Sequence, residues 1–308
     1  MKKIAIFSSG LILIILLMLP FIMGNLEKED LNSDTRSQLE GNFIELSDGF
    51  THYELKGPKD GKTIILVHGN AAPYVTWDYN FDALVNSGFR VLRYDIYGHG
   101  YSDRPNLEAY NNELYDRQLA ELIEKLDIKY PVYLVGTSQG GSIRAYFAAN
   151  HPQKVEKTAF LSPMFDDFEG KNMWSLLKTK GLGEYLISVL GDKFFTNPSK
   201  VLYSNEKKDE LTEKLLSQGK KKAVLANIRG DALNDATIYY EQVKQQDMPV
   251  LLTWGEHDKS ISEESMKRLC ELIPNIQYHQ IKNASHLAHY EIPEEMNLLL
   301  IDFFKTEK

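Results

Sequence analysis

A Gly-x-Ser-x-Gly turn near the middle of the chain constrains its fold more than any other feature. Residues 130–135 form an apolar, β-branched run that predicts a strand, and residues 139–150 predict a helix. Between them, Gly136 and Gly140 flank Ser138. So sharp a strand-to-helix turn needs small residues, because the two elements pack closely there. The turn lifts Ser138 to the carboxyl end of the strand, where its hydroxyl is a candidate nucleophile.

The pentapeptide by itself is weak evidence. At an average glycine usage of about 7%, a chance match occurs in roughly one chain in ten of this length. An ordinary serine in a glycine-rich turn is therefore the alternative. The independent test is whether an acid and a histidine follow in this order, each just past the end of a later strand.

Asp258 and His286 meet this test. Asp258 follows the apolar run 248–255, which predicts a buried parallel strand, and His286 follows a strand pattern at 276–282. A serine hydroxyl is a poor nucleophile, so it needs an imidazole to take its proton, and the imidazole needs a carboxylate to orient it. Ser138, Asp258 and His286 are the predicted catalytic residues.

Each of these roles has a rival in the sequence. His289 and His257 are the alternative bases; His289 is expected on the last helix and His257 in solvent. Asp166 and Asp167 are the alternative acids, because some hydrolases draw their carboxylate from the preceding strand, here predicted at 158–161. The order of the motifs favours the first set.

A tetrahedral oxyanion needs two N–H donors. The run 62–67 predicts a strand that ends in His68-Gly69, and the N–H of Asn70 is the predicted first donor. The N–H of Gln139 is the second, because it opens a helix, where N–H groups lack intrahelical acceptors. One such donor contributes on the order of 3–4 kcal/mol. His68 is expected to pack and hydrogen-bond within its own loop.

With these motifs the chain resembles the α/β-hydrolase fold superfamily over about residues 43–308. The resemblance rests on the His-Gly loop, the Asp-x-x-Gly-x-Gly-x-Ser segment within 94–105, the Gly-x-Ser-x-Gly turn and the segment 285–293. Ser285, where many members have glycine, is a departure. Asp95 is expected to hold its own glycine-rich loop and not to be the catalytic acid.

The resemblance implies a fold and a chemistry. The fold is α/β, a mostly parallel eight-stranded sheet flanked by helices with an inserted helical lid. The chemistry is hydrolysis through an acyl-enzyme, with no metal and no organic cofactor. Serine at the turn excludes the haloalkane dehalogenases and epoxide hydrolases of this fold, which carry aspartate there. Peroxidases and hydroxynitrile lyases also use serine and stay open.

Strand and helix patterns alternate through most of the chain, with helices expected at 77–87 and 114–126. The alternation breaks at about 163–246, the predicted lid, where helical patterns occur at 174–190 and 208–218. Apolar residues of the lid either line a pocket or form the lid's own core; the candidates are Met173, Trp174, Leu176, Leu177, Phe194 and Phe195.

Three further segments carry weaker signals. Arg229 is a possible anchor for a substrate carboxylate, as in relatives that cleave carbon–carbon bonds, but a solvent-facing arginine is favoured. Lys220-Lys221-Lys222 is interpreted as a solvated face. The segment 57–63 resembles a phosphate-binding P-loop, yet it is one residue short and precedes a strand, so we predict a turn.

The amino-terminal segment suggests export. Lys2 and Lys3 precede an uncharged run at 4–24, long enough to cross a bilayer. We predict a signal peptide or membrane anchor at 1–25 and a tether at 26–42. The lysines orient the catalytic domain outside the cytoplasm, anchored if the segment is uncleaved and secreted if it is cleaved.

Length and charge bound the remaining possibilities. The 308 residues fit one catalytic domain with an inserted lid, and the net charge of −8 disfavours nucleic-acid partners. Cys270 is the only cysteine.

We predict a serine hydrolase of a carboxylic ester, with a small apolar or lipid-like ester such as a monoacylglycerol as its partner. The alternatives are carbon–carbon hydrolysis of the meta-cleavage type, which the predicted membrane location disfavours, and a non-catalytic binding protein. Oligomeric state stays open.

Overall fold

The computed structural model describes residues 31–70, 73–166, 171–190, 202, 204, 207–208, 211 and 221–306, with the backbone alone at 171–174, 190 and 221–222. Its centre is one eight-stranded sheet, with the strands in the order β1-β2-β4-β3-β5-β6-β7-β8. The strands are β1 (Asn42–Leu46), β2 (Gly49–Lys56), β3 (Thr63–Val67), β4 (Arg90–Tyr94), β5 (Val132–Ser138), β6 (Val155–Pro163), β7 (Val250–Gly255) and β8 (Gln277–Ile281).

The sheet is mostly parallel, as the sequence predicts. Neighbouring strands from β4 through β8 pair in parallel, while β2 runs antiparallel to both β1 and β4. The β1–β2 hairpin turns at Ser47-Asp48-Gly49, with Leu46 opposite Gly49. Parallel pairing brings the carboxyl ends of β3 to β8 to one edge of the sheet, which is where the predicted site residues follow their strands.

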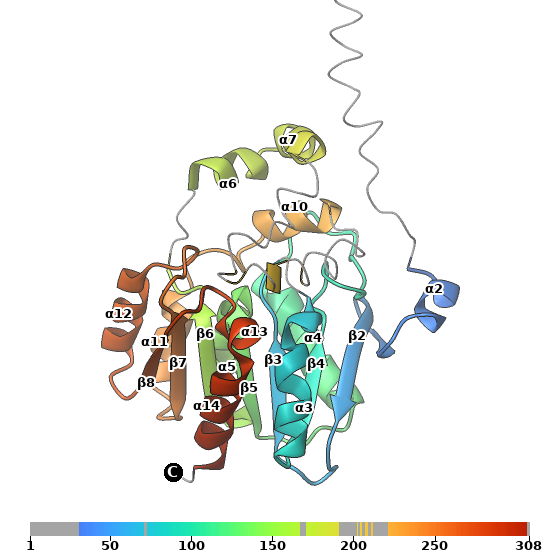
Figure 1. Ribbon diagram of the computed structural model, residues 1–308. Coiled ribbons are helices and arrows are strands. Elements are labelled where there is room, and N and C mark those ends of the chain that lie inside the picture. Colours follow the sequence, from blue (N-terminus) through green and yellow to red (C-terminus); the bar gives the residue numbers. More distant parts are fainter. Residues whose placement is uncertain are drawn as a thin grey trace, which may run out of the picture.

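Helices cover both faces of the sheet (Figure 1). Contacts between the helices group α4, α5, α11 and α12 together, and α3, α13 and α14 together. The helices of these two layers are α3 (Asp78–Asn86), α4 (Asn112–Lys125), α5 (Gln139–Asn150), α11 (Thr237–Lys244), α12 (Glu263–Leu272), α13 (Ala288–Glu291) and α14 (Pro293–Lys305). Shorter 3-10 turns are η1 (Tyr74–Trp77) and η2 (Pro152–Lys154).

Strand β3 shows why the apolar runs become central strands. All five of its residues are buried, and successive side chains point to opposite faces of the sheet. Ile65 and Val67 join the hydrophobic cluster that includes residues of α4 and α5, whereas Ile64 and Leu66 join the cluster that includes residues of α3 and α14. A strand buried on both faces has no polar side, which is the pattern that the sequence shows.

The insertion between β6 and β7 carries three helices in its described part, α6 (Lys171–Lys178), α7 (Leu182–Leu190) and α10 (Lys221–Arg229), before α11. Helix α10 lies over the carboxyl edge of the sheet, and α6 and α7 lie beyond it (Figure 1). The single helix predicted at 174–190 is wrong, because the chain turns between α6 and α7 and Gly181 takes a left-handed φ of +81°. Most of the predicted helix at 208–218 lies outside the described residues.

The predicted membrane-anchored localisation needs correction. Of the helices in the described ranges, none is long and apolar enough to span a bilayer. The longest, α4, has 14 residues, whereas a crossing needs about 20. The apolar run 4–24, from which the anchor was predicted, lies outside the described residues.

The amino-terminal part of the described chain contacts the sheet domain. Within the segment predicted as a tether, residues Ser33–Ser37 form the short helix α2, which Asn32 caps by accepting from the N–H groups of Asp34 and Thr35. Arg36 pairs with Asp103 at 2.5 Å.

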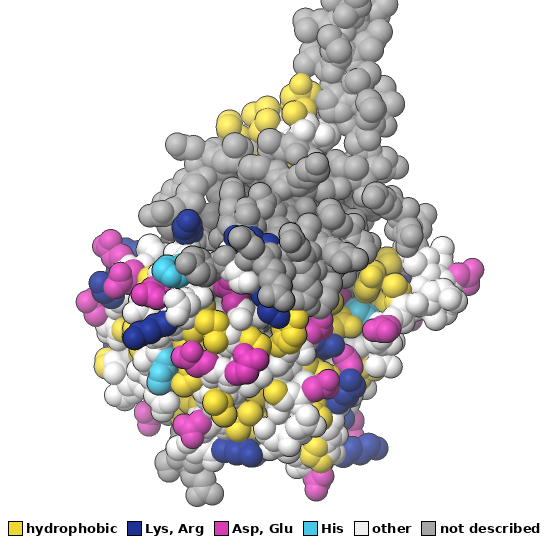
Figure 2. Space-filling model, viewed as in Figure 1, with side chains coloured by type: hydrophobic (Ala, Val, Ile, Leu, Met, Phe, Trp, Pro, Cys, Tyr) yellow, Lys and Arg dark blue, Asp and Glu magenta, His cyan; other side chains and the backbone are white. Residues whose placement is uncertain are grey.

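Figure 2 shows acidic and basic side chains interspersed over the described part of one face, so this surface has no continuous basic patch.

His289 lies in the core beside α3 and not on the last helix. It belongs to the short helix α13, which precedes α14, and its ring stacks on Trp77 at a centroid distance of 4.1 Å. The side chain is fully buried. Burial lowers the pKa of His289 to about 3, and the nearby His286 adds to this effect. His289 is therefore an uncharged packing residue at neutral pH.

We predict that His289 makes the fold sensitive to acid. The unfolded chain binds a proton at His289 near pH 6.5, whereas the folded chain does so only near pH 3. Above pH 6.5 His289 is neutral in both states and does not reduce the free energy of unfolding. As the pH drops from 6.5 toward 3, proton binding by the unfolded chain lowers that free energy by about 1.4 kcal/mol per pH unit. The variant His289→Phe can still stack on Trp77 but binds no proton. Its free energy of unfolding in urea should therefore fall less between pH 6.5 and 4.5 than that of the wild type.

The matched control is His257→Gln, because the His257 side chain is 37% exposed and reaches solvent. This control should keep the acid dependence of the wild type. The same slope in His289→Phe as in the wild type would contradict the assignment of a buried, neutral ring.

Candidate active site

Ser138 has a strained backbone at the end of β5. Its φ is +52° and its ψ is −124°, a conformation that non-glycine residues rarely adopt. The two flanking glycines explain how the chain fits. A Cβ on Gly136 would lie 2.4 Å from the carbonyl oxygen of Gly140, and a Cβ on Gly140 would lie 2.3 Å from the carbonyl oxygen of Val67. Helix α5 can approach β3 and β5 this closely only because both positions lack a side chain.

His286 and Asp258 contact each other on neighbouring loops of the same edge. Nδ1 of His286 lies 2.9 Å from Oδ2 of Asp258, and both side chains are buried, at 5% and 0% exposure. A carboxylate accepts hydrogen bonds, so the proton of a neutral His286 ring sits on Nδ1. The lone pair is then on Nε2, which is the arrangement that a general base requires.

Asp258 is held as a carboxylate. Burial by itself would raise its pKa, but the His286 ring and the N–H groups of Ile261 and Ser260 outweigh burial and keep the pKa below its usual range. Those two N–H groups donate to Oδ1 at 3.0 and 2.7 Å. Asp258 therefore stays charged at neutral pH and can stabilise a positive charge on His286.

The rival residues have other partners. Asp166 accepts a hydrogen bond from Ser265 at 2.6 Å and pairs with Arg268, so it binds α12. Asp167 lies outside the described residues. His257 is 37% exposed, and His289 packs on Trp77 as described above. Among the described candidates, the structure pairs His286 with Asp258 and not with Asp166.

Glu291 anchors the loop that carries His286. Its Oε2 accepts from the N–H of Ser285 at 2.7 Å, and its Oε1 accepts from the N–H of Ser204 at 2.8 Å. Ser285, the departure from the family's glycine, is accommodated because its hydroxyl donates to the carbonyl of His257 at 3.2 Å. The residue before His286 is thus held both through its N–H group and through its hydroxyl.

The loop after β3 lies against the turn that holds Ser138. A Cβ on Gly69 would lie 2.8 Å from Cβ of Ser138. Asn70 follows directly, so its backbone is beside the serine. His68 hydrogen-bonds within its own loop, where its Nδ1 lies 2.7 Å from the carbonyl oxygen of Gly69, and also beyond it, because its Nε2 accepts from the N–H of Ile96 after β4 at 3.0 Å.

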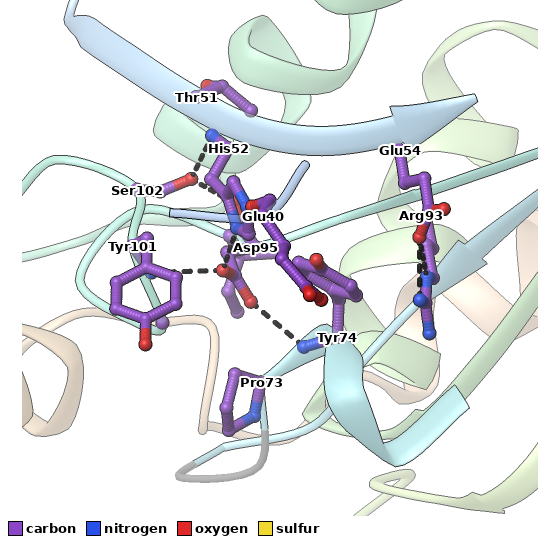
Figure 3. A network of polar contacts seen from close by, with 12 residues as sticks. Glu40, Thr51, His52, Glu54, Pro73, Tyr74, Arg93, Asp95, Tyr101 and Ser102 are labelled. Atoms are coloured by element: carbon purple, nitrogen blue, oxygen red, sulfur yellow. Dashed lines mark hydrogen bonds and ion pairs between the residues drawn. The ribbon is translucent and has the colours of Figure 1, made fainter. Parts of the chain in front are cut away.

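Asp95 joins the loops after β3 and β4 (Figure 3). Its Oδ1 accepts from the N–H of Tyr74 at 2.8 Å, and its Oδ2 accepts from the N–H of Tyr101 at 2.9 Å and lies 2.8 Å from Nδ1 of His52. Burial opposes ionisation, but His52, His68 and the Tyr74 N–H hold the pKa of Asp95 below its usual range. Asp95 thus organises its loop and pairs with His52.

Asn227 is a residue of the site edge that sequence reasoning missed. It comes from α10, and its side-chain amide faces the amide of Gln139: each NH₂ donates to the other's oxygen, at 2.7 and 3.0 Å. Asn227 also donates to Oδ1 of Asn70 at 3.1 Å. The sequence feature that could have indicated this role is that Asn227 is the one polar residue inside the apolar run 223–228.

The predicted roles of the insertion's side chains have mixed outcomes. Leu177 is buried in a cluster with Ile187 and residues of α10, so it belongs to the insertion's own core, and Leu176 is 46% exposed. Side chains of the other four apolar candidates lie outside the described part. Arg229 does not face solvent freely: it is 14% exposed and pairs with Glu184 of α7 at 2.8 Å.

No metal centre emerges in the described ranges, since no group of three or more His, Cys, Asp or Glu side chains is arranged to hold an ion.

The segment 57–63, which resembles a P-loop, forms the turn between β2 and β3 as predicted. It lies at the amino end of β3, at the opposite end of that strand from Gly69.

Comparisons with known proteins agree with this architecture. The chain is 26% identical to a 2-hydroxy-6-oxononadienedioate/2-hydroxy-6-oxononatrienedioate hydrolase of Cupriavidus pinatubonensis, covering 85% of this chain and 94% of the relative. It is also 26% identical to the carboxylesterase YbfK of Bacillus subtilis, covering 85% and 86%. The crystal structure of the enol-lactonase from Burkholderia xenovorans LB400 superposes with a TM-score of 0.70 at 21% identity, covering 86% of this chain and all of that chain.

The family match covers the elements that carry the site. Residues 62–293, more than half of the chain, match the family described as alpha/beta hydrolase fold, and this range runs from the start of β3 to the Glu-x-Pro segment after His286. The solved structure shares the fold. The chain therefore belongs to the α/β hydrolase fold family.

Proposed function

We propose that this protein is a serine hydrolase of carboxylic esters, with Ser138 as nucleophile, His286 as general base and Asp258 as the carboxylate that orients it. Hydrolase activity as such is supported by the family and by the relatives. The observation that carries the finer proposal is the 2.9 Å contact between His286 and a buried, charged Asp258, on the same sheet edge as a serine with a φ of +52°.

In the proposed reaction Ser138 attacks the ester carbonyl while Nε2 of His286 takes the hydroxyl proton. The N–H groups of Asn70 and Gln139 receive the negative oxygen of the tetrahedral intermediate. Its collapse breaks the bond to the alcohol, which leaves with the proton from His286. Water then attacks the acyl-enzyme, again giving a proton to His286, and the acid leaves as Ser138 regains its hydrogen.

We propose that the insertion of about 163–246 is a lid. Helix α10 lies over the carboxyl edge of the sheet, and the backbone N–H of Tyr110 donates to the carbonyl of Ala226 at 2.8 Å (Figure 1). A segment in this position restricts which acyl and alcohol groups reach Ser138. A small apolar or lipid-like ester, for example a monoacylglycerol, is the substrate class that we propose.

Two observations favour an ester. One relative is a carboxylesterase that aligns over 85% of this chain. In addition, Arg229, the residue that would anchor a substrate carboxylate in carbon–carbon cleavage, has its charge compensated by Glu184. Carbon–carbon hydrolysis is the second candidate, because another relative of equal identity is named as such a hydrolase.

The first prediction of this proposal concerns the substrate. The purified full-length chain should hydrolyse 4-nitrophenyl esters in a panel from acetate to palmitate, and Ser138→Ala should lose at least about 10³-fold in kcat/KM, since its nucleophile is gone. A vinylogous 1,3-diketone acid forms the second arm of the assay. Turnover in that arm alone would select carbon–carbon hydrolysis, and a folded sample that is inactive in both arms would favour a binding protein.

The second prediction concerns the acid. Asp258→Asn keeps the shape of the side chain but no longer holds the required tautomer of His286, so kcat should fall by about 10⁴-fold. Asp166→Asn is the matched control, because Asp166 also follows a strand of the same sheet edge but contacts only α12 among the described partners. We expect it to keep kcat within about twofold. A larger loss in Asp166→Asn than in Asp258→Asn would reverse the assignment.

A further inference from the structure

Asn227 is an unusual residue for the buried side of α10. Its helical neighbours Val224, Leu225 and Ile228 pack into the insertion's apolar cluster, yet Asn227 is fully buried with a polar amide. A buried amide destabilises a protein unless its hydrogen bonds are made. An apolar residue would dock α10 without that requirement, so the polar side chain calls for a specific role.

The Asn227 amide makes four hydrogen bonds. Its Oδ1 accepts from Nε2 of Gln139 at 2.7 Å and from the hydroxyl of Tyr115 at 2.9 Å. Its Nδ2 donates to Oε1 of Gln139 at 3.0 Å and to Oδ1 of Asn70 at 3.1 Å. An amide has two donor hydrogens and two acceptor lone pairs, so all of its capacity is used. A fully satisfied buried network of this kind is rigid.

The partners of Asn227 make the network informative. Asn70 and Gln139 are the two residues whose backbone N–H groups we propose as the oxyanion donors. Asn70 lies on the loop after β3, and Gln139 is the first residue of α5, directly after β5. Asn227 bonds to both side chains at once. Oδ1 of Asn70 also lies 3.1 Å from Nε2 of the buried His99, so this side chain is held from the insertion and from the sheet domain.

Helix α10 is itself fixed to the sheet domain close to Asn227. The N–H of Tyr110 donates to the carbonyl of Ala226 at 2.8 Å, and the N–H of Asn112 donates to Oδ1 of Asp231 at 2.7 Å. The second contact lies just past the end of α10 and does not involve the amide network. It therefore offers a way to loosen the insertion without touching Asn70 or Gln139.

We propose that Asn227 is a positioning residue for ester hydrolysis: its amide holds Asn70 and Gln139 together, so that oxyanion stabilisation depends on the docking of α10. This inference rests on the proposed function. Because the oxyanion exists only after attack on the ester, a misplaced donor lowers kcat and leaves the binding of the substrate nearly unchanged. A misplacement on the order of 1 Å costs up to about 10²-fold in rate.

The test compares two variants of the full chain on the best ester of the panel. Asn227→Leu has a similar volume and removes all four hydrogen bonds; we expect kcat to fall by about 30- to 100-fold with KM within about threefold. Asp231→Ala removes the neighbouring contact of the insertion; we expect its kcat to stay within about twofold even where its melting temperature falls. Asn227→Ser places one hydroxyl in the network, so its kcat should lie between those of the wild type and Asn227→Leu. If Asn227→Leu does not fold, Asn227→Ser is compared with Asp231→Ala instead.

A second readout separates this inference from the choice of substrate. A fluorophosphonate reacts with a serine nucleophile by forming an O–P bond and releasing fluoride, and the phosphoryl oxygen occupies the oxyanion position. The rate of labelling at Ser138, followed by peptide mass spectrometry, should fall in Asn227→Leu by a factor similar to that of kcat. Labelling of the wild type without ester turnover would refute the ester proposal alone, and the labelling rates would still decide the role of Asn227.

Two results from the variants would overturn the inference. One is a folded Asn227→Leu variant whose kcat and labelling rate stay within threefold of the wild type. The other is an Asp231→Ala variant that loses as much kcat as Asn227→Leu, because general loosening of the insertion would then explain the loss. Absence of Ser138 labelling in the wild type would refute the serine mechanism, and this inference with it.

Discussion

The close packing of α5 against the ends of β3 and β5 is the constraint on which the catalytic edge depends. The sparsely populated backbone conformation of Ser138, with φ +52° and ψ −124°, costs about 1–3 kcal/mol. The fold tolerates this cost because α5 buries Ile143 and Phe147 almost completely, and each such side chain contributes about 1.5–3 kcal/mol. The strain is therefore smaller than the packing energy that enforces it, and the serine hydroxyl is held at the carboxyl end of the sheet.

Buried polar groups hold the loops around this turn. Asp95 joins the loops after β3 and β4, and Glu291 holds the loop of His286. Asn227 connects the insertion both to the loop after β3 and to the first residue of α5. Each of these groups is hydrogen-bonded on several sides, and in a low-dielectric interior such contacts are both strong and costly to lose. The conformations of the loops around Ser138 are thus fixed by side chains that are distant from them in the sequence.

The sequence predicts the parts of this arrangement that depend on local patterns. Alternation of strands and helices predicts the sheet, and the turn around Ser138 predicts the sharp corner, because glycine spacing and apolar periodicity are local. The order of the motifs along the chain led to Asp258 and His286, which the structure brings into contact. The same reasoning placed one helix at 174–190, because apolar periodicity continues across Gly181 although the backbone turns there.

Contacts between distant segments escape such reasoning. Nothing in the local pattern pairs Asn227 with Asn70, which are 157 positions apart, or Asp95 with His52. The burial of His289 was also missed, because a helix start resembles a solvent-exposed site until the packing on Trp77 is seen. The membrane prediction came from the hydropathy of residues 4–24, which lie outside the described part of the chain, and no helix within the described part is long and apolar enough to span a bilayer.

A crystal structure of the full chain after reaction with a 4-nitrophenyl phosphonate tests the account most directly. We expect phosphorus bonded to Oγ of Ser138, a phosphoryl oxygen within about 3.1 Å of the N–H groups of both Asn70 and Gln139, and Nε2 of His286 facing the ester oxygen. Phosphorus on another residue, or a phosphoryl oxygen directed away from both N–H groups, would contradict the proposed catalytic arrangement.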